Sequence, residues 1–220
     1  MNGVFLVVSE LAKPCLDALG SSTARSAVLL AHDACEASAL AVVARFASEN
    51  RLASLAAQAK RNELDDETSE DFEETLEEVA RVLRHLETWK RFVAHTATTL
   101  GIKDLSFDES RLCLACDEMA AWYLVLEAHS LLSNLPSVDE IDGCFYVICE
   151  SATRAISTGC VKAADGALRD AKNILLGLLQ TLSSKAHASL ASFSKKNMIP
   201  GFIVSLEQEE AEEQSLTECQ

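Results

Sequence analysis

Apolar residues recur every three or four positions along most of this chain, which is the spacing of one face of an α-helix. The clearest stripe runs through Phe72, Leu76, Val79, Leu83, Leu86 and Val93, and a second runs through Leu112, Cys116, Met119, Tyr123 and Leu126. The β-branched residues do not gather in the alternating runs that would indicate strands. We therefore predict an all-α fold, an extended helical bundle or rod of about six helices, several of them long.

Two helices are expected before the first of these stripes. A short apolar helix covers Val4–Leu19 and is broken or kinked at Pro14, because proline lacks a backbone donor and clashes with the preceding turn. Gly20 stops it, and the hydroxyl residues that follow can cap the next helix. That helix is long and rich in alanine, covers Ala24–Ala59, and has an inward stripe of Val28, Ala31, Cys35, Ala39, Val42 and Phe46.

An acidic run separates this helix from the next. Residues 61–78 hold ten acids against Arg61 alone. We expect the run to form a loop and then to open the helix that carries the first stripe, since acidic side chains oppose the positive dipole of a helix start. That helix is predicted to end at Leu100-Gly101.

Two capping boxes, Ser106–Glu109 and Ser137–Glu140, are predicted to open the next two helices, because each pair can satisfy two unpaired backbone donors. The second of these helices has the apolar stripe Ile141, Phe145, Ile148, Ala152 and Ile156. After Gly159 comes a last helix over about 160–197, closed by Pro200-Gly201, with the stripe Val161, Ala164, Leu168, Leu175, Leu178 and Leu182. We expect one helical domain over 1–200 and an acidic, disordered tail over 201–220, since residues 207–220 carry six acids and no base.

The composition is that of a folded chain. Hydrophobic residues make up 49% of the 220 residues and charged residues 24%, which excludes a wholly disordered protein. The formal net charge of −15 repels phosphate backbones and disfavours direct binding of nucleic acid. The apolar run Val4–Val8 is too short for a signal peptide. No uninterrupted run approaches the ~20 residues of a membrane span, so we expect no transmembrane segment.

The sharpest local motif is Cys113-Leu-Ala-Cys116, because two cysteines at this spacing can bind zinc or exchange thiols. A structural zinc site needs a second pair, and Cys144 and Cys149 have four residues between them. Both pairs fall in helical apolar patterns, where free cysteine behaves as a small buried hydrophobe. With eight cysteines and no secretory signal, we expect reduced core cysteines in a reducing cytosol.

Other candidate chemistry is weaker. The segment His32-Asp33-Ala-Cys35-Glu36 combines imidazole, thiol and carboxylate, but adjacent positions on a helix do not face one another. The acidic run lacks the order and the glycine of an EF-hand, and the chain has no glycine-rich phosphate loop and no nucleophile elbow. We therefore expect no catalytic, cofactor-binding or metal site, and a protein that is not an enzyme.

Three segments, in order, resemble a known family. They are Glu118-Met-Ala-Ala-Trp-Tyr123-Leu-Val-Leu-Glu127, Ile141-Asp142-Gly-Cys-Phe145-Tyr146-Val-Ile148 and Arg154-Ala-Ile-Ser157. Their order and spacing resemble the middle region of the fourth subunit of the conserved oligomeric Golgi complex, and the likeness extends in pieces over about 20–195. Gly143 and Cys144 depart from the family pattern, and the loop between Leu135 and Ile141 is shorter.

This resemblance implies a helical-rod subunit of a multisubunit vesicle-tethering complex, cytoplasmic and peripheral on the Golgi membrane, that acts in intra-Golgi retrograde transport. It implies protein partners: the other tethering-complex subunits, Golgi SNAREs, Rab GTPases and coiled-coil tethers. The residue pattern alone supports a helical protein that works through its helix faces. It leaves open a stand-alone helical adaptor or a homodimeric coiled-coil scaffold joined along Phe72–Val93.

Overall fold

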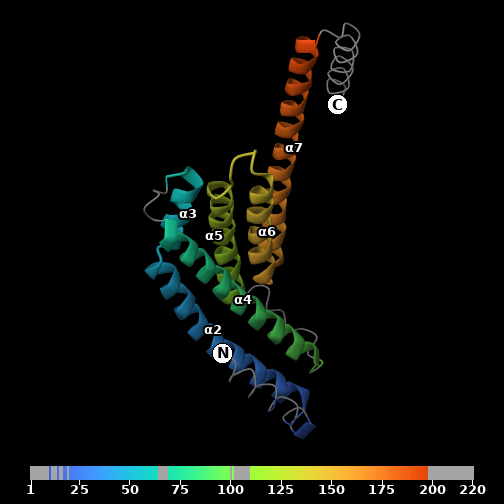
Figure 1. Cartoon of the computed structure of the whole chain (residues 1–220). Coiled ribbons are helices and arrows are strands. Elements are labelled where there is room, and N and C mark those ends of the chain that lie inside the picture. Colours follow the sequence, from blue (N-terminus) through green and yellow to red (C-terminus); the bar gives the residue numbers. More distant parts are fainter. Residues whose placement is uncertain are drawn as a thin grey trace, which may run out of the picture. The chain divides into compact units, whose positions relative to one another are not determined.

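The structure is a computed structural model, and it describes residues 20–63, 69–99, 101 and 110–197, with the isolated positions 10, 14, 17 and 18. Within these residues there are six α-helices and no strand (Figure 1), so the prediction of an all-α fold is confirmed. The helices are α2 (Ser21–Glu49), α3 (Leu52–Arg61), α4 (Ser69–Thr99), α5 (Arg111–Ser133), α6 (Ile141–Ser157) and α7 (Val161–Asn197). The capping box at Ser106, the acidic tail 201–220 and almost all of the predicted helix Val4–Leu19 lie outside the described residues.

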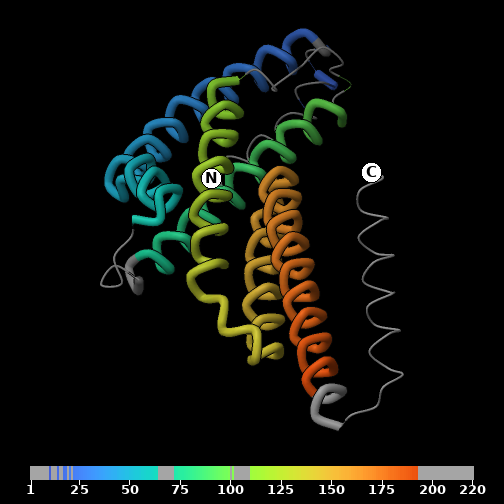
Figure 2. The backbone as a smooth tube through the Cα atoms, turned by 90° about the horizontal axis from the view of Figure 1, so that it is seen from above, coloured from blue at the N-terminus to red at the C-terminus, as the bar shows by residue number. Residues whose placement is uncertain are grey.

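The chain divides into two compact units, residues 1–171 and residues 172–220, with the division inside α7. In the first unit α5 is the central helix, because it contacts α2, α3, α4 and α6. Helix α4 crosses α5 and α6, as two views of the chain show (Figures 1 and 2). The second unit holds the part of α7 that begins at Lys172.

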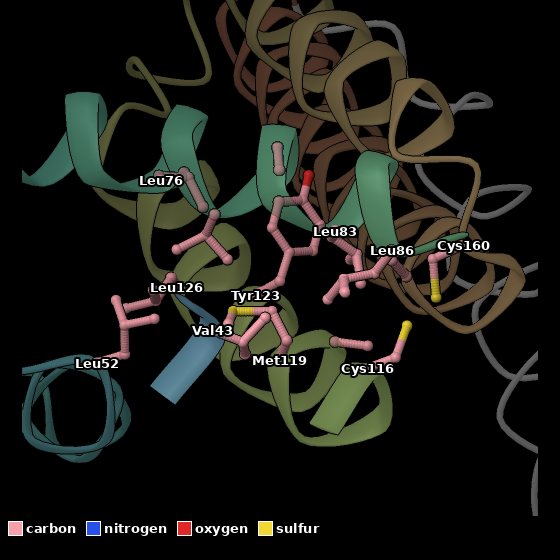
Figure 3. Packing of buried hydrophobic residues seen from close by; sticks show 14 of the residues in the cluster. Val43, Leu52, Leu76, Leu83, Leu86, Cys116, Met119, Tyr123, Leu126 and Cys160 are labelled. Carbon is pink, nitrogen blue, oxygen red and sulfur yellow. The ribbon is translucent and has the colours of Figure 1, made fainter. Parts of the chain in front are cut away.

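The core of the first unit is built on the two stripes that the sequence marks most clearly. Every predicted inward residue of α4, from Phe72 to Val93, is at most 7% exposed, and every predicted inward residue of α5 is at most 3% exposed. Leu76, Leu83 and Leu86 of α4 lie against Met119, Tyr123 and Leu126 of α5 (Figure 3). The long regular stripe on α4 therefore packs within the chain.

The predicted helix Ala24–Ala59 is wrong as a single helix, because a turn at Asn50 and Arg51 separates α2 from α3. Asn50 closes α2 by donating from both its backbone N and its Nδ2 to the carbonyl oxygen of Phe46, each at 3.0 Å. Arg51 then takes the left-handed conformation, at φ 48° and ψ 39°. That conformation costs a non-glycine residue about 1–2 kcal/mol. The turn offsets this cost by placing Leu52, Ala56 and Ala59 of α3 in the core.

Two predicted helix starts are also corrected. Helix α2 begins at Ser21 after Gly20, which has φ +83° and supplies no side-chain cap. Helix α6 begins at Ile141, so Ser137 and Glu140 do not form the predicted capping box around its first turn. The Ser137 hydroxyl instead accepts a bond from the Asp139 N–H, in the turn before the helix. Helix α5 is capped by Ser110, whose hydroxyl accepts from the Cys113 N–H at 3.1 Å.

The inward faces of α6 and of the start of α7 differ from the predicted ones. On α6 the buried residues are Cys144, Ile148, Ser151 and Ala155, whereas Ile141, Phe145 and Ile156 are 42%, 50% and 57% exposed. On α7 the buried residues are Ala163, Ala167 and Ala171, whereas Val161 and Leu168 are exposed. Small side chains allow close packing here: a Cβ on Gly166 would overlap the Leu124 side chain of α5. The closeness with which side chains pack, more than their hydrophobicity, therefore determines which faces of α6 and α7 are buried.

Helix α2 differs from its prediction in a second way. Its buried positions include Val28 and Ala39, as predicted, but Val43 faces the core while Val42 is 66% exposed. Within the described residues, Ser22–Glu49 is also long and apolar enough to cross a membrane by length and composition. Core helices of soluble proteins and signal sequences meet the same criterion; in this helix 22% of the apolar window is buried. Ala39 and Val43 of α2 belong to the core beside α5.

We predict that substituting Leu83 will test the packing of the α4 stripe. Leu83 is fully buried, so Leu83→Ala is expected to lower the free energy of unfolding by about 2–5 kcal/mol, measured in urea. Leu114→Ala, at a position 62% exposed on α5, is the control and is expected to change it by less than about 0.5 kcal/mol. Leu83→Asp is expected to unfold the chain. If the wild type were a dimer and Leu83→Asp a folded monomer, that result would contradict this packing and support a coiled-coil seam between two copies.

Candidate functional site

A buried ion pair joins α5 to α6. Arg154 of α6 donates through Nε and Nη2 to the two carboxylate oxygens of Glu127 on α5, at 2.9 and 3.0 Å. The Glu127 side chain is 2% exposed and that of Arg154 is 16% exposed. This two-bond arrangement suits the planar guanidinium and gives the pair directional strength.

Glu73 extends the pair to α4. Its carboxylate accepts from Arg154 Nη1 at 3.3 Å, from the Ser130 hydroxyl at 2.6 Å and from Asn134 Nδ2 at 2.9 Å. Burial by itself would lower the pKa of Arg154, but the carboxylates of Glu127 and Glu73 raise it, so the guanidinium stays charged. Burial and the Glu127 charge also raise the pKa of the neighbouring Tyr123 hydroxyl. One cation therefore ties three helices together.

Two arginines of α4, Arg84 and Arg91, bind the turn between α6 and α7. Arg84 donates from Nε to the Ser157 carbonyl oxygen at 2.7 Å and from Nη2 to the Ser157 hydroxyl at 2.8 Å, and Arg91 donates to the Gly159 carbonyl oxygen. Cations are favourable at the carbonyl end of a helix. Gly159 has φ +71°, and a Cβ there would lie 3.3 Å from Arg91 Nη2. Glycine is thus required both by the turn and by the arginine, and Gly159 does separate the last helix as predicted.

A groove of about 610 Å³ lies between α4 and α6. It is lined by charged, polar and small residues: Glu77, Ala80, Arg81, Arg84, Tyr146, Cys149, Glu150, Thr153, Arg154 and Ser157. Tyr146 is 70% exposed at this groove. Acidic and basic side chains are mixed along its walls, so the groove resembles the polar rim of a protein interface.

Beside this groove α6 carries a second apolar stripe, which we call the outer α6 stripe. It consists of Ile141, Phe145, Cys149, Ala152 and Ile156, which recur at helical spacing on one face. Ala152 is half-buried and the other four residues are exposed. Helix α6 is therefore apolar on its inward face and also on a neighbouring outward face. Contiguous exposed apolar residues of this kind mark sites of protein interaction.

The structure separates the cysteines that the sequence singled out. Cys113 and Cys116 are both buried on α5, and the Cys116 thiol donates to Glu87 Oε1 at 3.4 Å. Burial and the Glu87 charge raise the pKa of Cys116, which keeps it a thiol. Cys144 is buried against the carbonyls of Pro136 and Ser137, whereas Cys149 is exposed and lines the groove. The two pairs do not form a common set of metal ligands.

One group that could hold a metal does occur in the described part of the chain, and the sequence reasoning missed it. The ligand atoms of His32, Asp33 and Glu36 lie within 4.8 Å of one another. The spacing of four between His32 and Glu36 was the available signal, because such residues share a helix face. Structural contacts already engage two members: Glu36 Oε1 accepts from the Leu112 N–H at 2.8 Å, and His32 stacks on Trp89 at 4.9 Å. Burial lowers the pKa of His32, partly opposed by Glu36 and Asp33.

We predict that removing one partner of the buried pair is costly and removing both is not. Arg154→Leu leaves Glu127 buried without its cation and is expected to lower the free energy of unfolding by about 3–5 kcal/mol. The double variant Arg154→Leu with Glu127→Leu is expected to recover most of that loss in urea unfolding. Arg169→Leu is the control, because the Arg169–Asp165 pair is about 70% exposed on both sides and should change little. Equal losses for Arg154→Leu and Arg169→Leu would contradict this account.

A second prediction concerns cysteine reactivity. In the native chain, iodoacetamide is expected to modify Cys149 at least about tenfold faster than Cys113 or Cys116, because thiolate availability and access control the reaction. Labelling for a short time, followed by unfolding, a second isotopic label and peptide mass spectrometry, measures each site. Modification of Cys113 and Cys116 at the rate of Cys149 would instead indicate an accessible, reactive Cys-x-x-Cys motif.

Most of the polar groups described above thus form contacts between helices. The residues that carry the family resemblance include Tyr123, Glu127 and Arg154, and the structure brings these three together at the buried pair. The sequence marked Tyr123 also as part of an apolar stripe, but it marked Glu127 and Arg154 only through that resemblance and did not indicate that these two pair. Compared with known proteins, this chain matches no family model, no curated protein and no solved structure.

Proposed function

We propose that this chain is a helical subunit of a multisubunit protein assembly and that it works through its helix faces. The observation that carries the proposal is the outer α6 stripe, where Phe145 and Ile156 are 50% and 57% exposed on a helix that already buries the neighbouring face. A helix that is apolar on two sides is typical of an element covered on both. Covering one half-exposed side chain of this size contributes about 1 kcal/mol to binding.

The kind of assembly rests on the sequence resemblance. We propose a subunit of a vesicle-tethering complex, peripheral on the cytoplasmic side of the Golgi membrane, that acts in intra-Golgi retrograde transport through contacts with other subunits, SNAREs, Rab GTPases and coiled-coil tethers. Two of the three resembling segments meet at the Arg154–Glu127 pair. Part of the resemblance therefore falls on residues that hold α5 and α6 together.

A stand-alone adaptor or homodimeric scaffold is the alternative. The face along which the sequence suggested that two copies could join, Phe72–Val93, packs against α5 within one chain. A homodimer would have to use another apolar surface, and the outer α6 stripe is then the natural choice. The two functions differ in the partner that covers this stripe.

The first test is a gentle affinity purification of the tagged chain from its own cells, with quantitative mass spectrometry of the co-purifying proteins. The tethering function predicts several large helical proteins in fixed ratio, together with Golgi SNAREs. Recovery of the chain alone, or only with a second copy of itself, would contradict that function and favour the alternative.

We predict that the outer α6 stripe is required for this association. Phe145→Glu combined with Ile156→Glu is expected to reduce the recovered partners at least about tenfold, since charges would enter an apolar contact. The free energy of unfolding should change little, because both side chains are exposed. Leu114→Glu adds a charge at an exposed leucine of α5 and serves as the matched control. Undiminished recovery with the double variant would exclude the stripe as the contact.

A further inference from the structure

The charges of this chain are distributed very unevenly. The chain holds 34 acidic residues against 19 lysines and arginines, yet residues 171–206 contain no acid at all. The same stretch contains four lysines: Lys172, Lys185, Lys195 and Lys196. A positive segment in an otherwise strongly negative chain favours a negatively charged partner.

This basic stretch begins where α7 loses its buried face. The first turns of α7 bury Ala163, Ala167 and Ala171, whereas no residue from Lys172 to Ser192 is buried. Apolar residues nevertheless continue at helical spacing, in a surface that we call the α7 leucine stripe: Leu175, Leu178, Leu179, Leu182, Ala186 and Leu190. Leu179 and Leu190 are 62% and 49% exposed.

Two of the lysines flank the stripe. At 100° per residue, Lys172 and Lys185 lie at its opposite edges, on either side of Leu175 and Leu182. In paired helices, the residues that flank an apolar seam choose the partner through their charge. Lysine at both edges selects a helix with acidic residues at the facing positions.

We propose that α7, from Lys172 onward, binds an acidic amphipathic helix of another protein, with leucines on one face and glutamates or aspartates beside them. Pairing of this stripe with the same stripe of a second copy fits less well, because residues 171–206 have no acid to face the lysines in either orientation. The α7 leucine stripe shares no residue with the outer α6 stripe, so this binding does not rest on the proposed function.

The test uses purified full-length chain and a labelled synthetic peptide of about four heptads with leucine at a and d and glutamate at e and g. We expect this peptide to bind at least about tenfold more tightly than the same peptide with lysine at e and g, measured by fluorescence anisotropy. Raising the salt concentration should weaken the binding, because the flanking charges become screened. Equal affinity for the two peptides would overturn the proposal.

Variants of α7 locate the contact. Leu179→Glu with Leu182→Glu is expected to weaken peptide binding at least about tenfold. Gln180→Glu with Ser184→Glu adds the same charge on the other side of the helix and should leave the affinity within about twofold. Lys172→Gln with Lys185→Gln should lower the affinity and flatten its salt dependence. Circular dichroism checks that each variant keeps its helix.

Three results would identify another occupant and overturn the proposal. One is dimerisation of the wild-type chain in sedimentation velocity that Leu179→Glu with Leu182→Glu abolishes. Another is binding to vesicles of anionic lipid without binding to the acidic peptide. The last is peptide binding that appears only when the six glutamates of residues 207–220 are replaced by glutamine. Phe145→Glu with Ile156→Glu should keep peptide binding, which separates this contact from the outer α6 stripe.

Discussion

The docking of α6 in the first unit depends on one buried ion pair, Arg154 with Glu127. Two charges removed from water are costly unless each is fully paired. Helices α5 and α6 must therefore pack with the rotation about their axes that brings Arg154 and Glu127 together. Arg154 lies at one edge of the inward face of α6, and the outer α6 stripe lies at the other edge. Turning Arg154 toward Glu127 therefore turns Ile141, Phe145 and Ile156 outward. The same pair that joins α5 to α6 leaves an apolar surface for a partner.

The arginines of α4 complete this arrangement. Arg84 and Arg91 bind the carbonyl groups at the end of α6, and Gly159 makes the tight corner from which α7 starts. Alanines and Gly166 then let the first turns of α7 pack closely in the first unit, since small side chains permit close approach. Large apolar residues such as Leu168 are left outside. On α6 and on the first turns of α7, inward positions are thus taken mainly by small residues and by Arg154, which leaves larger apolar residues of these segments outside.

The candidate chemistry was only partly readable from the sequence. The interpretation of Cys113 and Cys116 as buried core residues agrees with their burial on α5, because their spacing places both on one face of a helix in an apolar stripe. The grouping of His32 with Glu36, and the pairing of Glu127 with Arg154, were not predicted. The grouping of His32 with Glu36 is local to α2, and their spacing of four was a readable signal. The pairing of Glu127 with Arg154 depends on the docking of α6 on α5, two helices whose relative rotation no local pattern gives.

The sequence by itself determined that the chain is helical, where most helices lie, and which faces of α4 and α5 are buried. Those two stripes are long, regular and flanked by polar residues, so periodicity alone specifies them. Only the tertiary structure decided the helix break at Arg51 and the inward faces of α6 and α7. There each helix is apolar on more than one side, or the inward residues are small. Packing fit and one buried charge pair, which no local pattern encodes, then select the face that is buried.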